Sequence, residues 1–234
     1  MSEETSDLSR TLGWLAAGTA FLHAAVDRIP DDGLREPSGL PGWSRAHVVA
    51  HLARNAEALG RLAGWARTGV ETPMYVNAQA RNADIEASAV FPADVLREEL
   101  AATSAGLDDA LALLDDDTWQ AAVRNAQGQS MPATTIPWMR TRETWLHTVD
   151  LAAGATVADL PADLLDALLG DVTTALSARE GCPAAMLEPD DRTRSWRLGE
   201  AGGPVVAGSA ASLVAWLTGR APRQGAQPEL ASWI

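Results

Sequence analysis

The segment that decides the fold reads Trp138-Met139-Arg140-Thr141-Arg142-Glu143-Thr144-Trp145-Leu146-His147-Thr148-Val149-Asp150. Its apolar residues recur at helical spacing, and Glu143 and His147 are four residues apart. On a helix, two residues at this spacing lie one turn apart on the same side, with Cβ atoms about 5–6 Å from each other. A carboxylate and an imidazole so placed can bind one metal ion. We expect a third ligand from a second helix, at His51.

The same residues also allow a structure without metal. The apolar surface of the helix means that an ionised Glu143 needs a partner, and Arg140 or Arg142 could supply one. His47 and His51 are themselves four residues apart and form a competing half-site. From the residues alone, the metal and the ion pair are equally good explanations of Glu143.

A site of two histidines and one glutamate leaves the fourth zinc position open, which is typical of catalytic zinc. Such a zinc can activate water or a thiol, and the softness of sulfur favours a thiol. The HExxH motif of the common zinc proteases is absent. Asp150 could orient the His147 ring from behind, although a surface acid at the end of the helix fits the pattern equally well.

Composition excludes several classes of function. The chain has 234 residues, of which 47% are hydrophobic, enough for one large domain or a main domain with a smaller partner. Its 18 basic and 31 acidic residues give a net charge of −13, which argues against binding nucleic acid or anionic membranes. No apolar run is long enough to span a bilayer, and the first residues are acidic, so we expect a cytoplasmic protein.

Two absences narrow the chemistry further. Cys182 is the sole cysteine, which excludes intrachain disulfides, CxxC redox pairs and thiolate zinc clusters. Lysine is missing altogether, which excludes Schiff-base catalysis and a phosphate-loop lysine.

Helical periodicity dominates the first two thirds of the chain. Ser44 is a suitable N-cap and Gly69 a suitable end for one long helix. The expected helices cover residues 7–29, 44–69, 91–114 and 137–153, with a short polar helix at 78–87. Residues 115–117 read as a solvated acidic turn, and residues 119–135 as a short hairpin or loop. Four long helices with modest loops predict a bundle, in which sites form between facing helices.

The pattern changes after Gly154 and predicts a small α/β unit. We therefore expect two domains, at residues 1–155 and 156–234. The expected elements of the second are a helix at 161–179, strands at 194–198 and 204–207 joined by a Gly-rich turn, and a helix from Ser209 to Gly219.

Three stretches make the chain similar to a known family. They read Gly42-Trp43-Ser44-Arg45-Ala46-His47-Val48-Val49-Ala50-His51, then Glu71-Thr72-Pro73-Met74-Tyr75-Val76 with Ala80-Arg81-Asn82, then Trp138 to Glu143 with His147 and Asp150-Leu151. Together they resemble the mycothiol-dependent maleylpyruvate isomerases, part of a wider DinB-like mycothiol-transferase group. The resemblance implies a mainly α fold, namely a DinB-like four-helix bundle followed by a small α/β C-terminal domain.

The resemblance also implies particular site residues. Zinc would be held by His51, Glu143 and His147. His47 would lie next to this site without binding the metal. The family has a functionally important arginine in a Gly-Arg pair after the last helix, which Gly219-Arg220 matches.

For three further residues, a second explanation is also possible. Arg223 is close enough to Arg220 to compete for the role of catalytic arginine. Arg81 is a candidate for binding the anionic substrate, with a surface ion pair as the alternative. Asn55, one turn past His51, is a second candidate for substrate binding, with structural hydrogen bonding as the alternative.

The implied activity is a zinc- and mycothiol-dependent cis-trans isomerisation of maleylpyruvate to fumarylpyruvate, by reversible addition of a thiolate to the double bond. Its partners would be a small thiol and a small dianionic enone, and we expect a monomer. A mycothiol S-transferase that releases an adduct, and a non-catalytic DinB-like metal-binding module, are the alternatives. A zinc hydrolase ranks last, because no second carboxylate base is evident.

Overall fold

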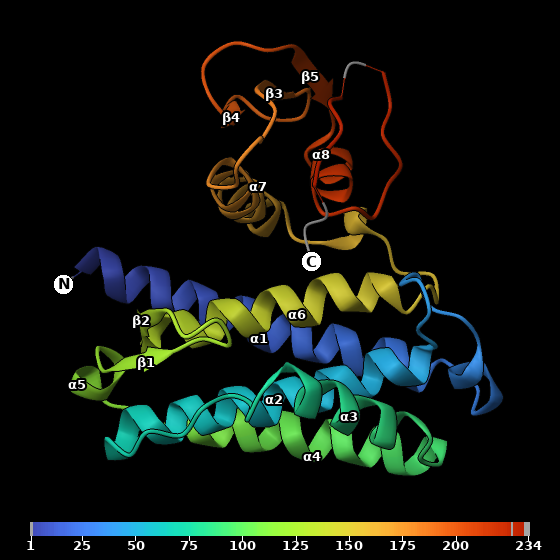
Figure 1. The fold of residues 1–234 in the computed structure, drawn as a ribbon, viewed down its shortest axis with the longest axis vertical. Coiled ribbons are helices and arrows are strands. Elements are labelled where there is room, and N and C mark those ends of the chain that lie inside the picture. The colour runs from blue at the N-terminus through green and yellow to red at the C-terminus, as the bar shows by residue number, and fades with distance from the viewer. Residues whose placement is uncertain (1, 226, 232–234) are drawn as a thin grey trace. The chain divides into compact units, whose positions relative to one another are not determined.

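The computed structural model describes residues 2–225 and 227–231. The chain divides into two compact units, Met1–Gly154 and Ala155–Ile234, which are described separately below. The first is built mainly of helices, and the second combines helices with a small sheet (Figure 1). The predicted fold class, a mainly α bundle followed by a small α/β part, is confirmed.

Long helices lying side by side form most of the first unit (Figure 1). Helix α2 packs against α4 and α6, and α6 packs against α1. The short helix α3 lies on α2. The long helices are α1 (Ser2–Asp27), α2 (Arg45–Thr68), α4 (Ala93–Ala112) and α6 (Ile136–Asp150); the short elements are α3 (Ala78–Ala89), α5 (Asp116–Trp119) and the strands β1 (Ala122–Arg124) and β2 (Ser130–Pro132).

Helix α2 begins and ends where the sequence predicts. The Ser44 side chain accepts a hydrogen bond from the backbone N–H of His47, and the His47 ring in turn accepts one from the backbone N–H of Ser44. This reciprocal capping satisfies two backbone donors at the start of the helix. Gly69 ends the helix with φ +72°, a left-handed conformation that favours glycine.

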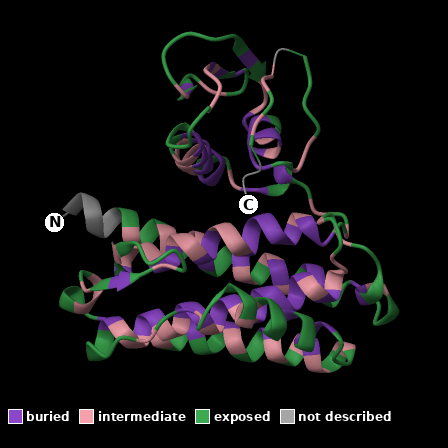
Figure 2. Cartoon of the chain, viewed as in Figure 1, coloured by how far each residue is buried: buried purple, intermediate pink, exposed green. Residues whose placement is uncertain are grey.

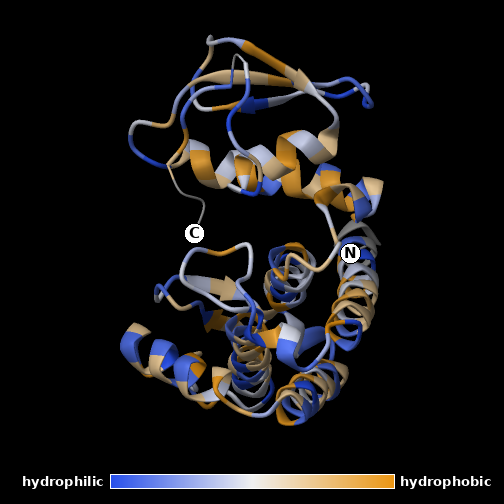
Figure 3. Ribbon diagram, turned by 90° about the vertical axis from the view of Figure 1, so that its right-hand side faces the viewer, coloured by the Kyte–Doolittle hydropathy of each residue, from blue (hydrophilic) through white to orange (hydrophobic). Residues whose placement is uncertain are grey.

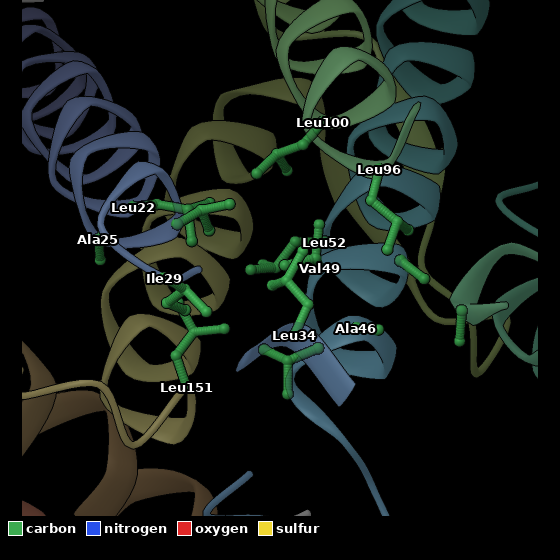
Figure 4. Close-up of a cluster of buried hydrophobic side chains, with 14 of the residues drawn as sticks. Leu22, Ala25, Ile29, Leu34, Ala46, Val49, Leu52, Leu96, Leu100 and Leu151 are labelled. Atoms are coloured by element: carbon green, nitrogen blue, oxygen red, sulfur yellow. The ribbon is translucent and has the colours of Figure 1, made fainter. Parts of the chain in front are cut away.

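Apolar side chains from several helices fill the core of the first unit. Buried residues lie on the faces that the helices turn towards one another (Figure 2), and the helices carry both hydrophobic and hydrophilic residues (Figure 3). One cluster joins α1, α2, α4 and the end of α6; its members include Leu22, Ile29, Val49, Leu52, Leu96, Leu100 and Leu151 (Figure 4). Burying each leucine contributes about 1.5–3 kcal/mol, so α2 and α6 are held firmly.

The segment between α4 and α6 differs in one respect from the sequence prediction. Residues 115–117 were expected to form a solvated turn, but Asp115 caps the one-turn helix α5 by accepting a hydrogen bond from the Thr118 N–H at 2.9 Å. The aspartates therefore serve as the N-cap and first turn of a helix, where negative charge is favourable. The expected hairpin is confirmed as the antiparallel pair β1–β2, with Val123 opposite Met131.

The second unit contains a three-stranded sheet in the order β4-β3-β5. Strand β3 pairs antiparallel with β4 and parallel with β5. The sequence predicted β4 and β5 as strands joined by a Gly-rich turn. It missed β3, which precedes them in the chain and lies between them in the sheet. The elements are α7 (Ala162–Ser177), β3 (Ala185–Pro189), β4 (Trp196–Leu198), β5 (Val205–Gly208) and α8 (Ala210–Leu217). In the described part of the chain, no helix combines the length and apolarity that crossing a membrane requires.

Candidate metal centre

Helices α2 and α6 bring three predicted ligands together. His51 Nε2, on α2, lies 2.9 Å from Glu143 Oε2 and 3.2 Å from His147 Nε2, both on α6. His147 Nε2 lies 3.1 Å from the same Glu143 oxygen. Among the described residues, these three form a group whose ligand atoms all lie within 4.8 Å of one another and could hold a metal ion.

The donor set fits zinc. Three atoms at these separations leave a point about 2 Å from each of them, the usual length of zinc bonds to nitrogen and oxygen. The side chains of His51 and His147 are only 5% and 8% exposed, whereas that of Glu143 is 25% exposed. The group is therefore buried on the side of the histidines and open beside the carboxylate, which leaves a face for a fourth ligand.

Asp150 contacts the nitrogen of the His147 ring that faces away from the candidate metal site. Its Oδ2 lies 2.7 Å from His147 Nδ1, and the residue is only 3% exposed. A carboxylate there accepts the Nδ1–H, which leaves Nε2 of the neutral ring free to bind metal. Of the two explanations that the sequence allowed for Asp150, the orienting contact is confirmed and the surface acid is wrong.

Hydrogen bonds set the charges of the three residues. Burial would raise the pKa of Glu143, but the hydrogen bonds to His147 and His51 outweigh it and hold that pKa well below its ordinary value. Burial would lower the pKa of His147, but Asp150 and Glu143 raise it. For His51 burial prevails, and its pKa is lowered. The group therefore keeps an ionised carboxylate, as metal binding requires.

A buried arginine lies one turn before Glu143. Arg140 is fully buried, and its Nη1 donates hydrogen bonds to the Leu52 carbonyl at 2.7 Å and to Asn55 Oδ1 at 2.9 Å. Burial lowers its pKa to about 10, so the guanidinium remains charged at neutral pH. Within the described chain Arg140 makes no ion pair with Glu143, so the metal-free alternative is not formed through Arg140. Arg142 stays the predicted partner in that alternative.

Asn55 is buried among these polar groups, with 5% of its surface exposed. Its side-chain oxygen is occupied by Arg140, as the structural alternative expects. A role for Asn55 in substrate binding stays a prediction.

Arg81 and Tyr75 lie beside the three-residue group. Arg81 Nη2 lies 3.2 Å from His51 Nδ1, and the Arg81 guanidinium carbon lies 5.8 Å from the centre of the Tyr75 ring. Burial raises the pKa of Tyr75; Arg81 opposes that shift and the Glu143 charge adds to it. The surface ion pair expected as the alternative for Arg81 is not found among the described residues. Its role in substrate binding stays a prediction.

His47 has other partners. Besides capping α2, its Nε2 lies 3.3 Å from Glu86 Oε2, and its ring stacks on Trp43 at 6.2 Å between centroids. The Nε2 atoms of His47 and His51 have different partners, Glu86 and Glu143, so the two rings do not form the competing half-site.

Comparison with known proteins covers most of the chain. A family model described as the mycothiol maleylpyruvate isomerase N-terminal domain matches residues 15–152, and one described as the MDMPI C-terminal domain matches residues 159–231. The chain belongs to this family. No curated protein matches the chain.

Two solved structures are similar over most of their length. A crystal structure of the mycothiol-dependent maleylpyruvate isomerase is 35% identical, with a TM-score of 0.87, and the match covers 92% of this chain and 90% of that one. A crystal structure of a histidine-to-alanine mutant of the isomerase is 34% identical, with the same coverage and TM-score.

Arg220, the predicted catalytic arginine of this chain, lies in the second unit. Arg220 follows α8, where its backbone N–H donates to the Ala215 carbonyl at 2.7 Å and its Nη1 to the Thr218 carbonyl at 3.1 Å. Arg223 lies three residues further on and is exposed. The choice between the two arginines, and the catalytic role itself, stays a prediction.

Sequence reasoning gave no role to Tyr75 and treated Arg140 only as a partner for Glu143. Tyr75 lies in the Glu71–Tyr75 segment that carried the family resemblance, and that segment was the available signal. Arg140 lies three residues before Glu143, so helical spacing alone places it beside Glu143 on the helix surface. Its full burial could not be deduced without knowing which helices pack around it.

Proposed function

We propose that this chain is a zinc- and mycothiol-dependent isomerase that converts maleylpyruvate into fumarylpyruvate. The observation that carries the proposal is the convergence of His51, Glu143 and His147 in a chain of the mycothiol maleylpyruvate isomerase family. The activity itself is that named for the similar solved structures.

The three side chains would hold zinc with two nitrogens and one oxygen, and the fourth position would remain for a ligand from outside the protein. When bound there, zinc supplies a positive charge that lowers the pKa of a thiol, so that its sulfur is held as thiolate at neutral pH. The partial exposure of the Glu143 side chain supports approach of that ligand from the side of the carboxylate.

The chain's own residues prepare the site. Asp150 fixes the His147 ring through Nδ1, and the ionised Glu143 contributes the negative charge that balances the cation. The Trp43 ring lies 5.6 Å from the His51 ring, between centroids, and places an aromatic side chain beside this ligand. These contacts hold the donor atoms in place before any ligand arrives.

The thiol would supply addition of its sulfur to one carbon of the cis double bond, which makes that bond single and allows rotation. Elimination of the same thiolate from the rotated adduct would then restore the double bond in the trans product. The addition forms a carbon–sulfur bond and moves an electron pair onto the conjugated carbonyl as an enolate, and the elimination reverses both changes. The two carboxylates of the substrate and the developing enolate are the negative charges that cations can stabilise. We assign Arg81 to a carboxylate and Arg220 to the enolate, each as a prediction.

The experiment follows one substrate with and without thiol. Zinc-loaded protein is incubated with maleylpyruvate, with or without mycothiol, and the products are identified by proton NMR. We expect fumarylpyruvate only where mycothiol is present, with the thiol recovered unchanged. Thiol consumed in proportion to product would identify an S-transferase instead. No product either with or without mycothiol would leave a metal-binding module without this activity.

We further expect the protein to act on small molecules alone, as a cytoplasmic monomer. The net charge of −13 supports the absence of nucleic-acid and anionic membrane partners. Analytical ultracentrifugation tests the monomer directly, and a concentration-dependent sedimentation coefficient would contradict it.

A further inference from the structure

Arg81, on α3, contacts the outer nitrogen of a candidate zinc ligand. Its Nη2 lies 3.2 Å from Nδ1 of His51, its Nη1 donates to Asn82 Oδ1 at 3.1 Å, and its guanidinium lies over the Tyr75 ring. In the described part of the chain Arg81 has no carboxylate partner.

The chemistry of the two groups fixes the direction of this hydrogen bond. A guanidinium has five N–H donors and no acceptor, so the Arg81 hydrogen must be accepted by a lone pair on His51 Nδ1. A neutral imidazole carries one N–H, which therefore sits on Nε2. That N–H points at Glu143 Oε2, 2.9 Å away. The contact with Arg81 thus selects the tautomer whose hydrogen occupies the nitrogen that a metal would need.

Metal binding requires the opposite tautomer of His51. A neutral imidazole bound through Nε2 carries its hydrogen on Nδ1. This hydrogen would face the N–H of Arg81 Nη2, which lies 3.2 Å from Nδ1, and two donors cannot form a hydrogen bond with each other. The charge of His51 is the same in both tautomers, so the conflict concerns only the position of one hydrogen. His147 has no such conflict, because its Nδ1–H faces the Asp150 carboxylate.

We propose that metal binding at His51 and the Arg81–His51 hydrogen bond exclude each other, and that the released Arg81 guanidinium binds a carboxylate of the anionic substrate. The inference rests on the proposed function and adds an order to it: metal first, anion second. After release from His51, Arg81 still contacts the Tyr75 ring and Asn82. Its remaining N–H groups can form a bidentate pair of hydrogen bonds with a carboxylate. Metal binding therefore makes Arg81 available to bind the anion.

The first test is zinc affinity, measured by competition with a chromophoric chelator. Arg81→Met keeps an unbranched side chain against Tyr75 but removes every donor. Because the competing hydrogen bond is lost, this variant should bind zinc about two- to tenfold more tightly than the wild type, the range expected for one net hydrogen bond. Arg81→Lys, which retains a donor, should lie between them. Arg67→Met, an exposed arginine near the end of α2, should leave the affinity unchanged.

The second test is anion affinity, measured by calorimetry with maleate as the probe. Zinc-loaded wild type should bind maleate at least about tenfold more tightly than zinc-loaded Arg81→Met, since a bidentate charged contact is lost. Zinc itself attracts maleate in both proteins, so the comparison between the two loaded forms isolates Arg81. Equal affinities would overturn the anion subsite.

The outcomes separate this inference from the proposed function. Zinc binding that is unchanged or weakened in Arg81→Met would overturn the exclusion, because Arg81 would then coexist with the metal or support it, while the metal site itself would stand. A wild type that binds no zinc would overturn both.

Discussion

Asp150 shows how one residue outside the donor set controls it. The carboxylate is buried, accepts a hydrogen bond from His147 Nδ1, and contributes to the raised pKa of that ring. In a zinc site, such a partner fixes the tautomer and increases the basicity of the ligating nitrogen. The residue should therefore matter to metal affinity although it touches no metal.

Asp150→Asn keeps the size of the side chain and removes its charge. We expect the zinc affinity to fall about 10- to 100-fold, the usual cost of losing such a partner. Chelator competition measures it, and Asp109→Asn, an exposed acid on α4, is the control. An affinity equal to that of the wild type would contradict the orienting role.

Glu143→Gln tests the charges within the metal-free group. Because the folded pKa of Glu143 is depressed, the carboxylate stabilises the fold above its unfolded pKa of about 4.3, and this stability is lost as the pH falls through the folded value. The raised pKa of His147 stabilises the fold below about pH 6.5, and this part is lost as the pH rises through the folded value.

Glu143 contributes to both shifts, so the wild type should exceed Glu143→Gln in stability most clearly between about pH 5 and 6.5. Urea unfolding in the presence of a chelator, repeated across pH, measures the difference. A difference that stays constant from acid to alkaline pH would show that the carboxylate acts through packing and not through its charge.

At the scale of elements, the site depends on how closely α6 is packed. Gly18 of α1 faces α6 so closely that a Cβ atom placed there would lie 2.5 Å from Trp145 Nε1 and 2.6 Å from Thr144 Oγ1. The Trp145 indole donates to the Trp14 carbonyl at 2.9 Å across the same contact. Helices α1 and α6 can approach this closely only because residue 18 lacks a side chain.

Gly18→Ala should therefore lower the free energy of unfolding by about 1–3 kcal/mol, as overpacking does. A Cβ atom added at Gly13, in the same helix, would meet no other atom within 4 Å, so Gly13→Ala should raise it by about 0.5–1 kcal/mol. Chemical denaturation measures both. The idea of a close α1–α6 contact fails if the two variants change stability in the same direction.

The buried arginine links α6 to α2 through Asn55. Asn55→Ala removes the acceptor at 2.9 Å from Arg140 Nη1 and leaves a buried cation with fewer partners, so we expect a loss of about 1–3 kcal/mol. Asn55→Asp restores an acceptor and should lose less. Denaturation gives the stabilities, and steady-state kinetics gives KM. An Asn55→Ala protein of full stability but raised KM would make Asn55 a substrate contact instead.

Elements with strong local signals could be predicted from the sequence. Helix α2 has a capping serine and a terminal glycine, and α6 has both its apolar period and the Glu143–His147 pair. Strand β3 was missed because its run Ala185-Met186-Leu187-Glu188-Pro189 contains one weakly hydrophobic residue and one proline among its three buried positions. Its identity as a strand comes from pairing with β4 and β5, which no local pattern reveals.

At the scale of the whole molecule, the three candidate ligands belong to one unit and the predicted catalytic arginine to the other. The ligands could be predicted because helical spacing relates Glu143 to His147, although His51 needed the family resemblance in addition. No spacing rule relates Arg220 to them, because it follows a separate helix in a separate unit. Its role is therefore a question for kinetics.

Arg220→Met and Arg223→Met, compared with each other, test that role. If Arg220 stabilises the enolate, its loss should lower kcat about 100-fold or more, while Arg223→Met stays close to the wild type. Zinc content should be unchanged in both, since neither arginine belongs to the donor set. Equal and mild effects would remove both arginines from the mechanism.

The most direct measurement for the central claim is the zinc content of the purified chain after dialysis against zinc, determined by elemental analysis. We expect one zinc per chain in the wild type and in His47→Ala, which alters a histidine one turn earlier in α2. His51→Ala and His147→Ala should retain little or none while keeping their helical circular dichroism. Equal zinc content in all four proteins would contradict the account, because the metal would then be bound elsewhere.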